Sequence, residues 1–225
     1  SKRYDVIISE PSNPWMAGVA TLFTREFFLA AKERLNTGGI LCQWAHTYDI
    51  SDADLRSIIA TFLSVFSDGS VWLVGDGDVL LIGSETPLDM LLTNMPKAWE
   101  RTAVTTDLRE VNLRDPFSLL SLFVARGTTI KKYVGDAQIQ TDDKNSLEFS
   151  APRGIYGKTE YTNAVTLRAL RDQAPMPTII TTTKASASGE HWRNRGLMYL
   201  RAEAYDTAFE DFVYALRKTP SDREA

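Results

Sequence analysis

The order of apolar and polar positions in the first part of the chain predicts a strand, a helix and a second strand. Residues 4–9 are short, β-branched and almost continuously apolar, which is typical of a strand buried in a parallel sheet. Residues 24–35 have a helical composition, with Thr24 as the N-cap and an Asn-Thr-Gly-Gly stop at 36–39. Residues 40–44 then read as the next strand.

The clearest periodicity along the chain predicts a helix over residues 51–66. Ser51 is its N-cap, and Asp54 stands three residues further on, as in a capping box. Apolar side chains follow at i, i+3, i+4, i+7, i+8 and i+11, so that one face carries Leu55, Ile58, Ile59, Phe62, Leu63 and Phe66. Residues 71–74 and 79–82 read as two strands around Gly-Asp-Gly-Asp, which predicts an antiparallel hairpin.

This order of elements predicts an α/β fold, specifically the second half of a doubly wound sheet that ends in a hairpin. Such sheets bind ligands outside the carboxyl ends of their strands. The loop at 10–18 and the segment at 43–48 follow the first two strands. We therefore expect a binding site where these two segments meet.

The rest of the chain predicts helices, one extended segment and a linker. Residues 88–99 and 116–126 read as helices, and residues 138–153 as an extended segment with an acidic pair. Residues 172–189 are rich in Thr, Ser and Pro, which is typical of a linker. A domain boundary is therefore expected there.

The C-terminal segment, residues 190–225, resembles a tetratricopeptide unit, a helical hairpin. Seven positions match the spacing of the repeat: Trp192, Gly196, Tyr199, Ala208, Phe212, Ala215 and Pro220. Only Arg195 departs, because the pattern prefers Leu there. A single unit cannot bury its own faces, so a next unit is expected to begin near Asp222. Because the chain begins with Ser1 and ends within this pattern, we read it as a segment of a longer protein.

Composition excludes several classes of function. The chain has 25 basic and 29 acidic residues and a net charge of −4, so the basic excess of a nucleic-acid binder is absent. The longest uncharged runs, at 11–24 and 35–48, are shorter than the about 20 apolar residues that a membrane span needs. Cys42 is the only cysteine, so neither an intramolecular disulfide nor a cysteine-based zinc site is expected. We expect a cytoplasmic location.

Three stretches of the chain resemble the spermidine synthase (polyamine aminopropyltransferase) family: residues 4–14, 22–28 and 38–43. The likeness is good over residues 4–84 and looser at 141–143, 147–149 and 151–153. It is strongest to a bacterial branch whose members often join such a domain to tetratricopeptide repeats and sometimes to membrane segments. The resemblance therefore leaves open that the longer protein is membrane-tethered.

The resemblance implies a Rossmann-like sheet of the S-adenosylmethionine methyltransferase type, entered here at its fourth strand. The expected organisation is a partial Rossmann domain at 1–171, a linker at 172–189 and one tetratricopeptide unit at 190–225. The glycine-rich loop and the acidic residue that hold the nucleoside would lie upstream. We therefore expect this segment to bind no cofactor, while S-adenosylmethionine or its decarboxylated form is the co-substrate of the intact parent.

The family's loop after the fourth strand reads Asp-Ser-Ser-Asp-Pro, and Glu10 and Asn13 stand at its two acidic positions. In the family the first carboxylate helps to deprotonate the attacking amine and the second holds the polyamine. Glu10 keeps the first function, because an ammonium nucleophile must lose a proton before it attacks a sulfonium. Asn13 cannot neutralise an ammonium, which argues against putrescine as the substrate. Gln43 matches a family glutamine and, with Tyr48, is expected to contact the amine.

Each candidate also has a structural alternative. Glu10 can cap the loop or pair with a basic residue, and Asn13 can form an Asx-turn. His46 follows Trp44 toward the same rim and can be a base, a metal ligand or a hydrogen-bonded structural residue. Cys42 reads as a small buried apolar residue. A second set can bind a divalent cation or form a solvated turn: Asp142, Asp143 and Glu148.

Three functions follow from these residues. The first is aminopropyl transfer to a small amine, with Glu10 as the base and Asn13, Gln43 and Tyr48 at the acceptor. The second is a related methyl or alkyl transfer to another nucleophile. The third is a non-catalytic scaffold that binds a protein or peptide through its tetratricopeptide repeats.

Overall fold

The computed structural model describes residues 2–155 and 160–221 and shows a mixed α/β protein with an open five-stranded sheet. The chain forms two compact units, each assembled from two segments. The sheet unit comprises Ser1–Leu88 and Phe123–Pro175. The helical unit comprises Asp89–Leu122 and Met176–Ala225. The second unit therefore takes up residues 89–122 in addition to the C-terminal segment.

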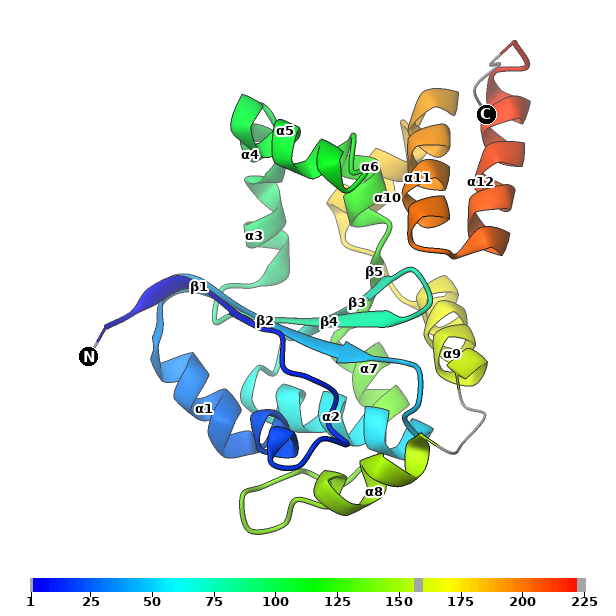
Figure 1. Ribbon diagram of the computed structural model, residues 1–225. Coiled ribbons are helices and arrows are strands. Elements are labelled where there is room, and N and C mark those ends of the chain that lie inside the picture. Colours follow the sequence, from blue (N-terminus) through cyan, green and yellow to red (C-terminus); the bar gives the residue numbers. More distant parts are fainter. Residues whose placement is uncertain (1, 156–159, 222–225) are drawn as a thin grey trace. The chain divides into compact units, whose positions relative to one another are not determined.

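The sheet unit contains all five strands, in the order β1-β2-β4-β3-β5 (Figure 1). They are β1 (Tyr4–Ser9), β2 (Leu35–His46), β3 (Ser70–Val74), β4 (Asp78–Gly83) and β5 (Phe123–Arg126). Only β1 and β2 are parallel, and the other three neighbouring pairs are antiparallel. The predicted first two strands and the β3–β4 hairpin are thus confirmed.

Helices α1 (Arg25–Glu33), α2 (Asp52–Val65) and α7 (Gly127–Val134) lie on one face of this sheet (Figure 1). Both predicted N-caps are present, because the side chains of Thr24 and Ser51 accept hydrogen bonds from the first turns of α1 and α2. The predicted apolar face of α2 is buried. Burial of such large aliphatic and aromatic side chains stabilises the fold by about 1.5–3 kcal/mol each.

The hydrophobic core between α2 and the sheet is too tight for any side chain at Gly83. A Cβ atom there would lie 2.5 Å from Cγ of Phe66 and 2.7 Å from Cζ of Phe62, whose rings stack with centroids 5.0 Å apart. The remaining elements of this unit are the 3₁₀ helix η1 (Val19–Phe23) and the helices α8 (Leu147–Gly154) and α9 (Glu160–Gln173).

Strand β1 is an edge strand with an exposed apolar face. Within the described residues it has β2 as its one neighbour in the sheet. Val6 is 54% and Ile8 72% exposed, whereas Ile7 packs against the core. Residues 4–9 are apolar on both faces, and for this reason the sequence predicted a strand buried on both sides. In the structure only the face that carries Ile7 is covered.

Several predicted elements differ from the structure. The predicted helix at 116–126 is wrong in its second half, where β5 follows the short helix α6 (Pro116–Leu120). Phe123, Val124 and Ala125 are buried, and a short apolar run is compatible with either a buried strand or a helix. The extended segment predicted at 138–153 contains α8, which accommodates Pro152 within the helix. The predicted linker at 172–189 contains α10 (Thr178–Ala185).

The helical unit contains α3 (Leu88–Thr93), α4 (Met95–Trp99), α5 (Thr102–Glu110), α6, α10, α11 (Gly189–Arg201) and α12 (Tyr205–Lys218). The single helix predicted at 88–99 is interrupted, and Pro96 stands in the first turn of α4. Described residues 2–155 and 160–221 include no helix long and apolar enough to cross a membrane.

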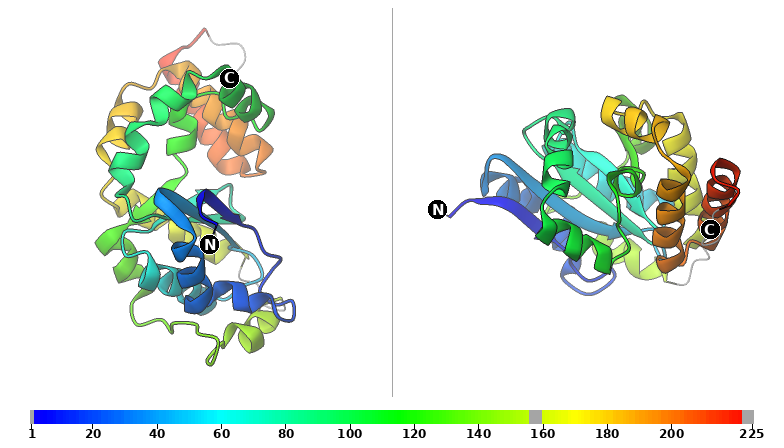
Figure 2. Two further views of the ribbon diagram at one scale, coloured as in Figure 1. Left: turned by 90° about the vertical axis from the view of Figure 1, so that its left-hand side faces the viewer. Right: turned by 90° about the horizontal axis from the view of Figure 1, so that it is seen from above.

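Helices α11 and α12 form a tightly packed hairpin (Figure 2). A Cβ atom at Gly196 would lie 2.7 Å from Cε1 of Phe212, so a small residue is required where the helices approach. Arg195 donates through Nε to Oδ2 of Asp211 at 2.7 Å and forms a second bond to Oδ1, and Asp211 is 2% exposed. This bidentate pair explains why Arg stands where the tetratricopeptide pattern expected from the sequence prefers Leu. The next unit expected near Asp222 lies outside the described residues.

Candidate functional site

The candidate site lies at the rim of the sheet unit where β1 and β2 end. Ser9 pairs with Gln43 and Ile8 with Cys42, so these side chains share faces of the sheet in pairs. Alternation along β2 places Cys42, Trp44 and His46 on one face, and Gln43 on the face that packs against the helices. The two strands thus present different side chains on the two sides of one rim.

Glu10 is exposed directly after β1, on the side of the rim near Cys42. Burial raises the pKa of the Cys42 thiol, and the negative charge of Glu10 raises this pKa further. Cys42 is therefore a neutral thiol rather than a reactive thiolate. Within the described residues the Glu10 carboxylate makes no hydrogen bond or ion pair. Its oxygens remain available to a ligand, and the cap or ion-pair alternative is not observed there.

Four rings gather beside this rim, and we refer to Trp15, Trp44, His46 and Tyr48 as the aromatic cluster. The His46 ring lies 4.9 Å from Trp15, 5.4 Å from Trp44 and 4.6 Å from Tyr48, measured between centroids. Trp44 and His46 share a face because they are two residues apart in β2. Trp15 comes from the loop after β1, so the cluster joins the two segments predicted to form the site.

His46 is held as a neutral imidazole with one free acceptor. Its Nδ1 lies 2.6 Å from the carbonyl oxygen of Tyr48, so Nδ1 must carry the proton and donate it. Nε2 is then an acceptor, and it is buried without a hydrogen-bond partner among the described residues. Burial lowers the pKa of His46, against the opposing effects of the Tyr48 carbonyl, Asp49 and Asp78. The structure therefore places an unprotonated ring nitrogen inside the cluster.

The amide oxygens of Asn13 and Gln43 are also buried and have no partner among the described residues. The Asn13 side chain forms no Asx-turn, because the loop turns through its main-chain oxygen, which accepts from Met16 N at 3.0 Å. Gln43 is fully buried, and its Nε2 donates to the carbonyl oxygen of Trp44 at 2.9 Å. Both oxygens can therefore accept a further hydrogen bond.

Two carboxylates beside the aromatic cluster, those of Asp78 and Asp49, were not identified from the sequence. Asp78 pairs with His46 across β2 and β4, and its Oδ1 accepts from Nε1 of Trp44 at 3.0 Å. Burial raises the pKa of Tyr48, and the charges of Asp78 and Asp49 raise it further. Ring faces flanked by carboxylates attract organic cations. The sequence shows that Asp78 follows the predicted hairpin turn. It does not show that Asp78 lies opposite His46, because the register of β2 and β4 decides that pairing.

The acidic segment after residue 140 forms hydrogen bonds to residues at and before the start of α1. Oδ1 of Asp142 accepts from Oγ1 of Thr24 at 2.8 Å, at the start of α1. Oε1 of Glu148 accepts from the main-chain nitrogen of Gly18 at 3.1 Å. Within residues 2–155 and 160–221, no three His, Cys, Asp or Glu side chains gather closely enough to hold a metal ion. The cation site considered for Asp142, Asp143 and Glu148 is thus not formed by these residues.

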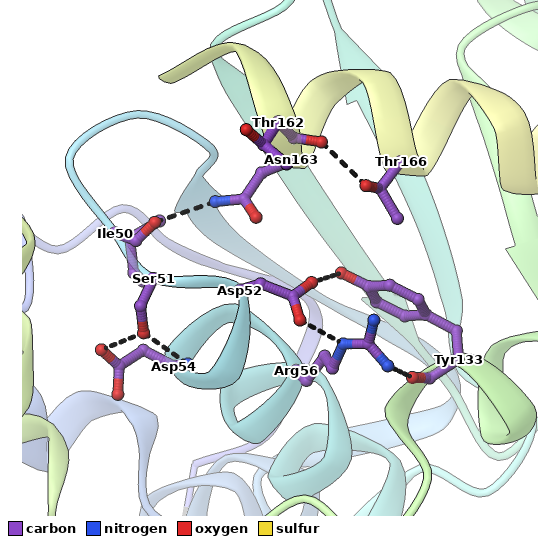
Figure 3. A network of polar contacts seen from close by, with 9 residues as sticks. All are labelled: Ile50, Ser51, Asp52, Asp54, Arg56, Tyr133, Thr162, Asn163 and Thr166. Carbon is purple, nitrogen blue, oxygen red and sulfur yellow. Dashed lines mark hydrogen bonds and ion pairs between the residues drawn. The ribbon is translucent and has the colours of Figure 1, made fainter. Parts of the chain in front are cut away.

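A second polar region lies at the start of α2 (Figure 3). It borders a cavity of about 360 Å³. Asp52 accepts from Nε of Arg56 at 2.7 Å and from the Tyr133 hydroxyl at 3.4 Å, and Arg56 also donates to the carbonyl oxygen of Tyr133. Burial, together with the charge of Asp52, raises the pKa of Tyr133. These charged groups compensate one another, which is typical of a structural network.

The segment before α8 carries a buried polar network around Gln140. Its Oε1 accepts from Ser146 N at 2.8 Å, and its Nε2 donates to the hydroxyls of Ser57 and Ser146. Its main-chain nitrogen donates to Oγ1 of Thr61 at 2.8 Å. Gln140 is fully buried, and both ends of its amide have partners.

A scan against models of known protein families finds no match, and a search of curated proteins finds none either.

Proposed function

We propose that this chain carries the acceptor-binding part of a spermidine synthase-like aminopropyltransferase. In this proposal β1 to β4 belong to the second half of a Rossmann-like sheet of the methyltransferase type. The helices α11 and α12 are then one tetratricopeptide unit. The family resemblance and the strand–helix order support this assignment, and S-adenosylmethionine or its decarboxylated form is the co-substrate of the longer protein.

The observation that carries the proposal is the uncompensated Glu10 carboxylate at the carboxyl end of β1, on the side of the sheet near the aromatic cluster. An amine acceptor arrives as an ammonium ion, which donates protons and accepts none. Glu10 attracts this ion by its charge, and the ring faces with Asp49 and Asp78 extend the favourable field. The free acceptors of Asn13 and His46 suit the N–H groups of such a ligand.

The proposed chemistry needs one proton acceptor at this rim. Glu10 takes a proton from the ammonium, and the freed nitrogen lone pair attacks the propyl carbon attached to the sulfonium sulfur. The new N–C bond forms as the C–S bond breaks, and its electron pair leaves with sulfur as a neutral thioether. Because Asn13 stands where the family has a second carboxylate, the binding free energy of a diamine is less favourable by about 1–3 kcal/mol.

The test is turnover by the intact parent protein with decarboxylated S-adenosylmethionine and a set of amines. We expect Glu10→Gln to abolish aminopropyl transfer while nucleoside affinity stays unchanged, because the amide keeps the shape but accepts no proton. Glu33→Gln is the matched control, since Glu33 is an exposed glutamate at the end of α1. Unchanged turnover in Glu10→Gln would remove this residue from the mechanism.

Methyl transfer and a scaffold function are the alternatives that the same assay separates. A parent that methylates an acceptor but transfers no aminopropyl group would establish the related alkyltransferase. A parent that binds no nucleoside would support the scaffold, in which the helical hairpin binds a protein or peptide. The exposed aromatic residues of α12, Tyr205 and Phe209, are the observation that favours this last function.

A further inference from the structure

The two edges of the five-stranded sheet differ in how far they are covered. At one edge, β5 is only four residues long, its residues Phe123, Val124 and Ala125 are buried, and α9 packs against it. At the other edge, β1 is six residues long, and Val6 and Ile8 are exposed (Figure 1). The outer main-chain N–H and C=O groups of an edge strand can pair with another strand. Among the described residues, the sheet is therefore open at β1.

Strand β1 is regular along this edge and presents one apolar face. Tyr4 pairs with Leu35 and Val6 with Ile40, so the irregularity of this ladder lies in β2, and β1 itself stays extended. Tyr4, Val6 and Ile8 alternate along the strand and share its exposed face. Native edge strands are commonly protected by a central charge or a proline, and the central residues of β1 carry neither.

We propose that this edge pairs with β1 of a second copy of the chain, antiparallel, about a two-fold axis that passes through the sheet at Val6. A two-fold contact is self-complementary, so each residue meets the one equally far beyond the axis. Val6 then faces Val6 of the other copy, Tyr4 faces Ile8, and Lys2 faces Glu10. The apolar face continues across both copies, and a pair of opposite charges closes each end.

The two charged residues lie on the face that this pairing requires. Nζ of Lys2 lies 5.2 Å from the ring centroid of Tyr4, on the exposed face of β1. Glu10 follows β1 on the side near Cys42, which pairs with Ile8 and therefore shares its face. Each copy thus offers an ammonium at one end of the apolar face and a carboxylate at the other.

Charge selects this register over the neighbouring two-fold registers. A pairing centred on Asp5 would set this residue opposite Asp5 of the other copy, and like charges directly opposite destabilise paired strands. A pairing centred on Ile7 would set Glu10 opposite Tyr4, so that the carboxylate gains no cation. Only the register centred on Val6 matches both the apolar and the charged positions.

The inferred dimer is weak and independent of the proposed function. Two short strands bury less surface than a standard protein–protein interface, so we expect a dimer that dissociates on dilution. Sedimentation of the chain at rising concentration measures this equilibrium without amine or nucleoside. Failure of aminopropyl transfer would therefore leave the pairing of β1 unaffected.

The register can be tested by disulfide cross-linking in a Cys42→Ser background, which removes the single native cysteine. Tyr4 N donates to Arg34 O at 2.8 Å, so Val6, two residues further on, also directs its main chain toward β2. The Val6 pair between copies is then a non-hydrogen-bonded pair, whose Cα atoms lie about 4.5 Å apart and suit a disulfide. We expect Val6→Cys to form a covalent dimer on mild oxidation.

Ile8→Cys is the matched control. Ile8 is more exposed than Val6, at 72% against 54%, so random collisions would favour its oxidation. In the proposed register Ile8 faces Tyr4, and two cysteines at position 8 lie too far apart to bond. We expect Ile8→Cys to stay monomeric alone and to cross-link when it is mixed with Tyr4→Cys. The same cysteines in the longer protein test the occupant, and loss of the cross-link there would assign the edge to another segment and overturn the dimer.

Charge reversal tests the two outer pairs. Lys2→Glu should weaken the dimer by at least about fivefold, because each dimer then holds two pairs of opposed carboxylates. Adding Glu10→Lys should restore the dimer, which a loss of folding cannot imitate. Lys132→Glu is the control, since Lys132 is exposed on α7. A chain that stays monomeric at every concentration, equal cross-linking of Val6→Cys and Ile8→Cys, or a double variant as weak as Lys2→Glu would each overturn the proposal.

Discussion

Two fully buried glutamines of the sheet unit, Gln140 and Gln43, differ in how far their amides are satisfied. Gln140 has partners for both its oxygen and its nitrogen, supplied by Ser57 and Ser146. Gln43 donates through its nitrogen to Trp44, but its oxygen has no partner among the described residues. Satisfied buried groups rigidify a fold, whereas unsatisfied ones cost free energy unless a ligand meets them. The difference separates a satisfied structural network from a buried acceptor near the end of β2 that has no partner among the described residues.

The largest effect on the free energy of unfolding is expected at the buried ion pair between Arg195 and Asp211 in the helical unit. We expect Arg195→Leu to lower the free energy of unfolding by about 3–5 kcal/mol, because it leaves a buried carboxylate without its guanidinium. The double variant Arg195→Leu/Asp211→Leu should recover most of this loss. Urea unfolding measures both. A single variant as stable as the double would show that the pair does not stabilise the hairpin.

The glutamine contrast itself predicts unequal costs for one chemical change. Gln140→Leu should lower the free energy of unfolding by about 2–3 kcal/mol, because it leaves Ser146 N and nearby hydroxyls buried without partners. Gln43→Leu should cost less, about 0.5–1.5 kcal/mol, because it removes one hydrogen bond to the Trp44 carbonyl and an acceptor that has no partner among the described residues. Gln138→Leu, at an exposed side chain two residues before Gln140, is the control. Equal losses of unfolding free energy in Gln43→Leu and Gln140→Leu would show that the two buried amides do not differ in how far they are satisfied.

The smallest effect concerns pH. Burial lowers the folded-state pKa of His46, so the unfolded state binds the proton more readily. The stability that neutral His46 contributes is complete above its unfolded pKa of about 6.5 and is lost as the pH falls through the lower folded-state value. His46→Gln should flatten this part of the pH–stability curve. An unchanged slope between pH 7 and pH 5 would show that His46 is not buried as described.

Local patterns predicted the parts of the fold that depend on nearby residues. The face of α2, the caps at Thr24 and Ser51, and the β3–β4 hairpin follow from spacing and turn chemistry alone. Strand β5 did not, because its apolar residues suit a helix equally well until a neighbouring strand selects the extended form.

The candidate site was predictable only in its location. The rim after β1 and β2 follows from strand order, and Glu10 and Tyr48 lie there as expected. The sequence could not show that alternation turns Gln43 away from His46, or that Trp15 and Asp78 reach the same rings. These contacts join segments distant in the sequence, and strand register and loop path decide them. The Arg195–Asp211 pair escaped prediction for the same reason, since the repeat pattern specifies only packing.

The most direct measurement for the proposed amine site adds the carboxylate that the chain lacks. Calorimetric titration of Asn13→Asp with a diamine should show binding about ten- to a hundredfold tighter than the unaltered chain, because a second carboxylate faces the second ammonium. Adding Glu10→Gln to this variant should remove the gain. Unchanged affinity in Asn13→Asp, or a gain that survives the loss of Glu10, would contradict an amine site at this rim.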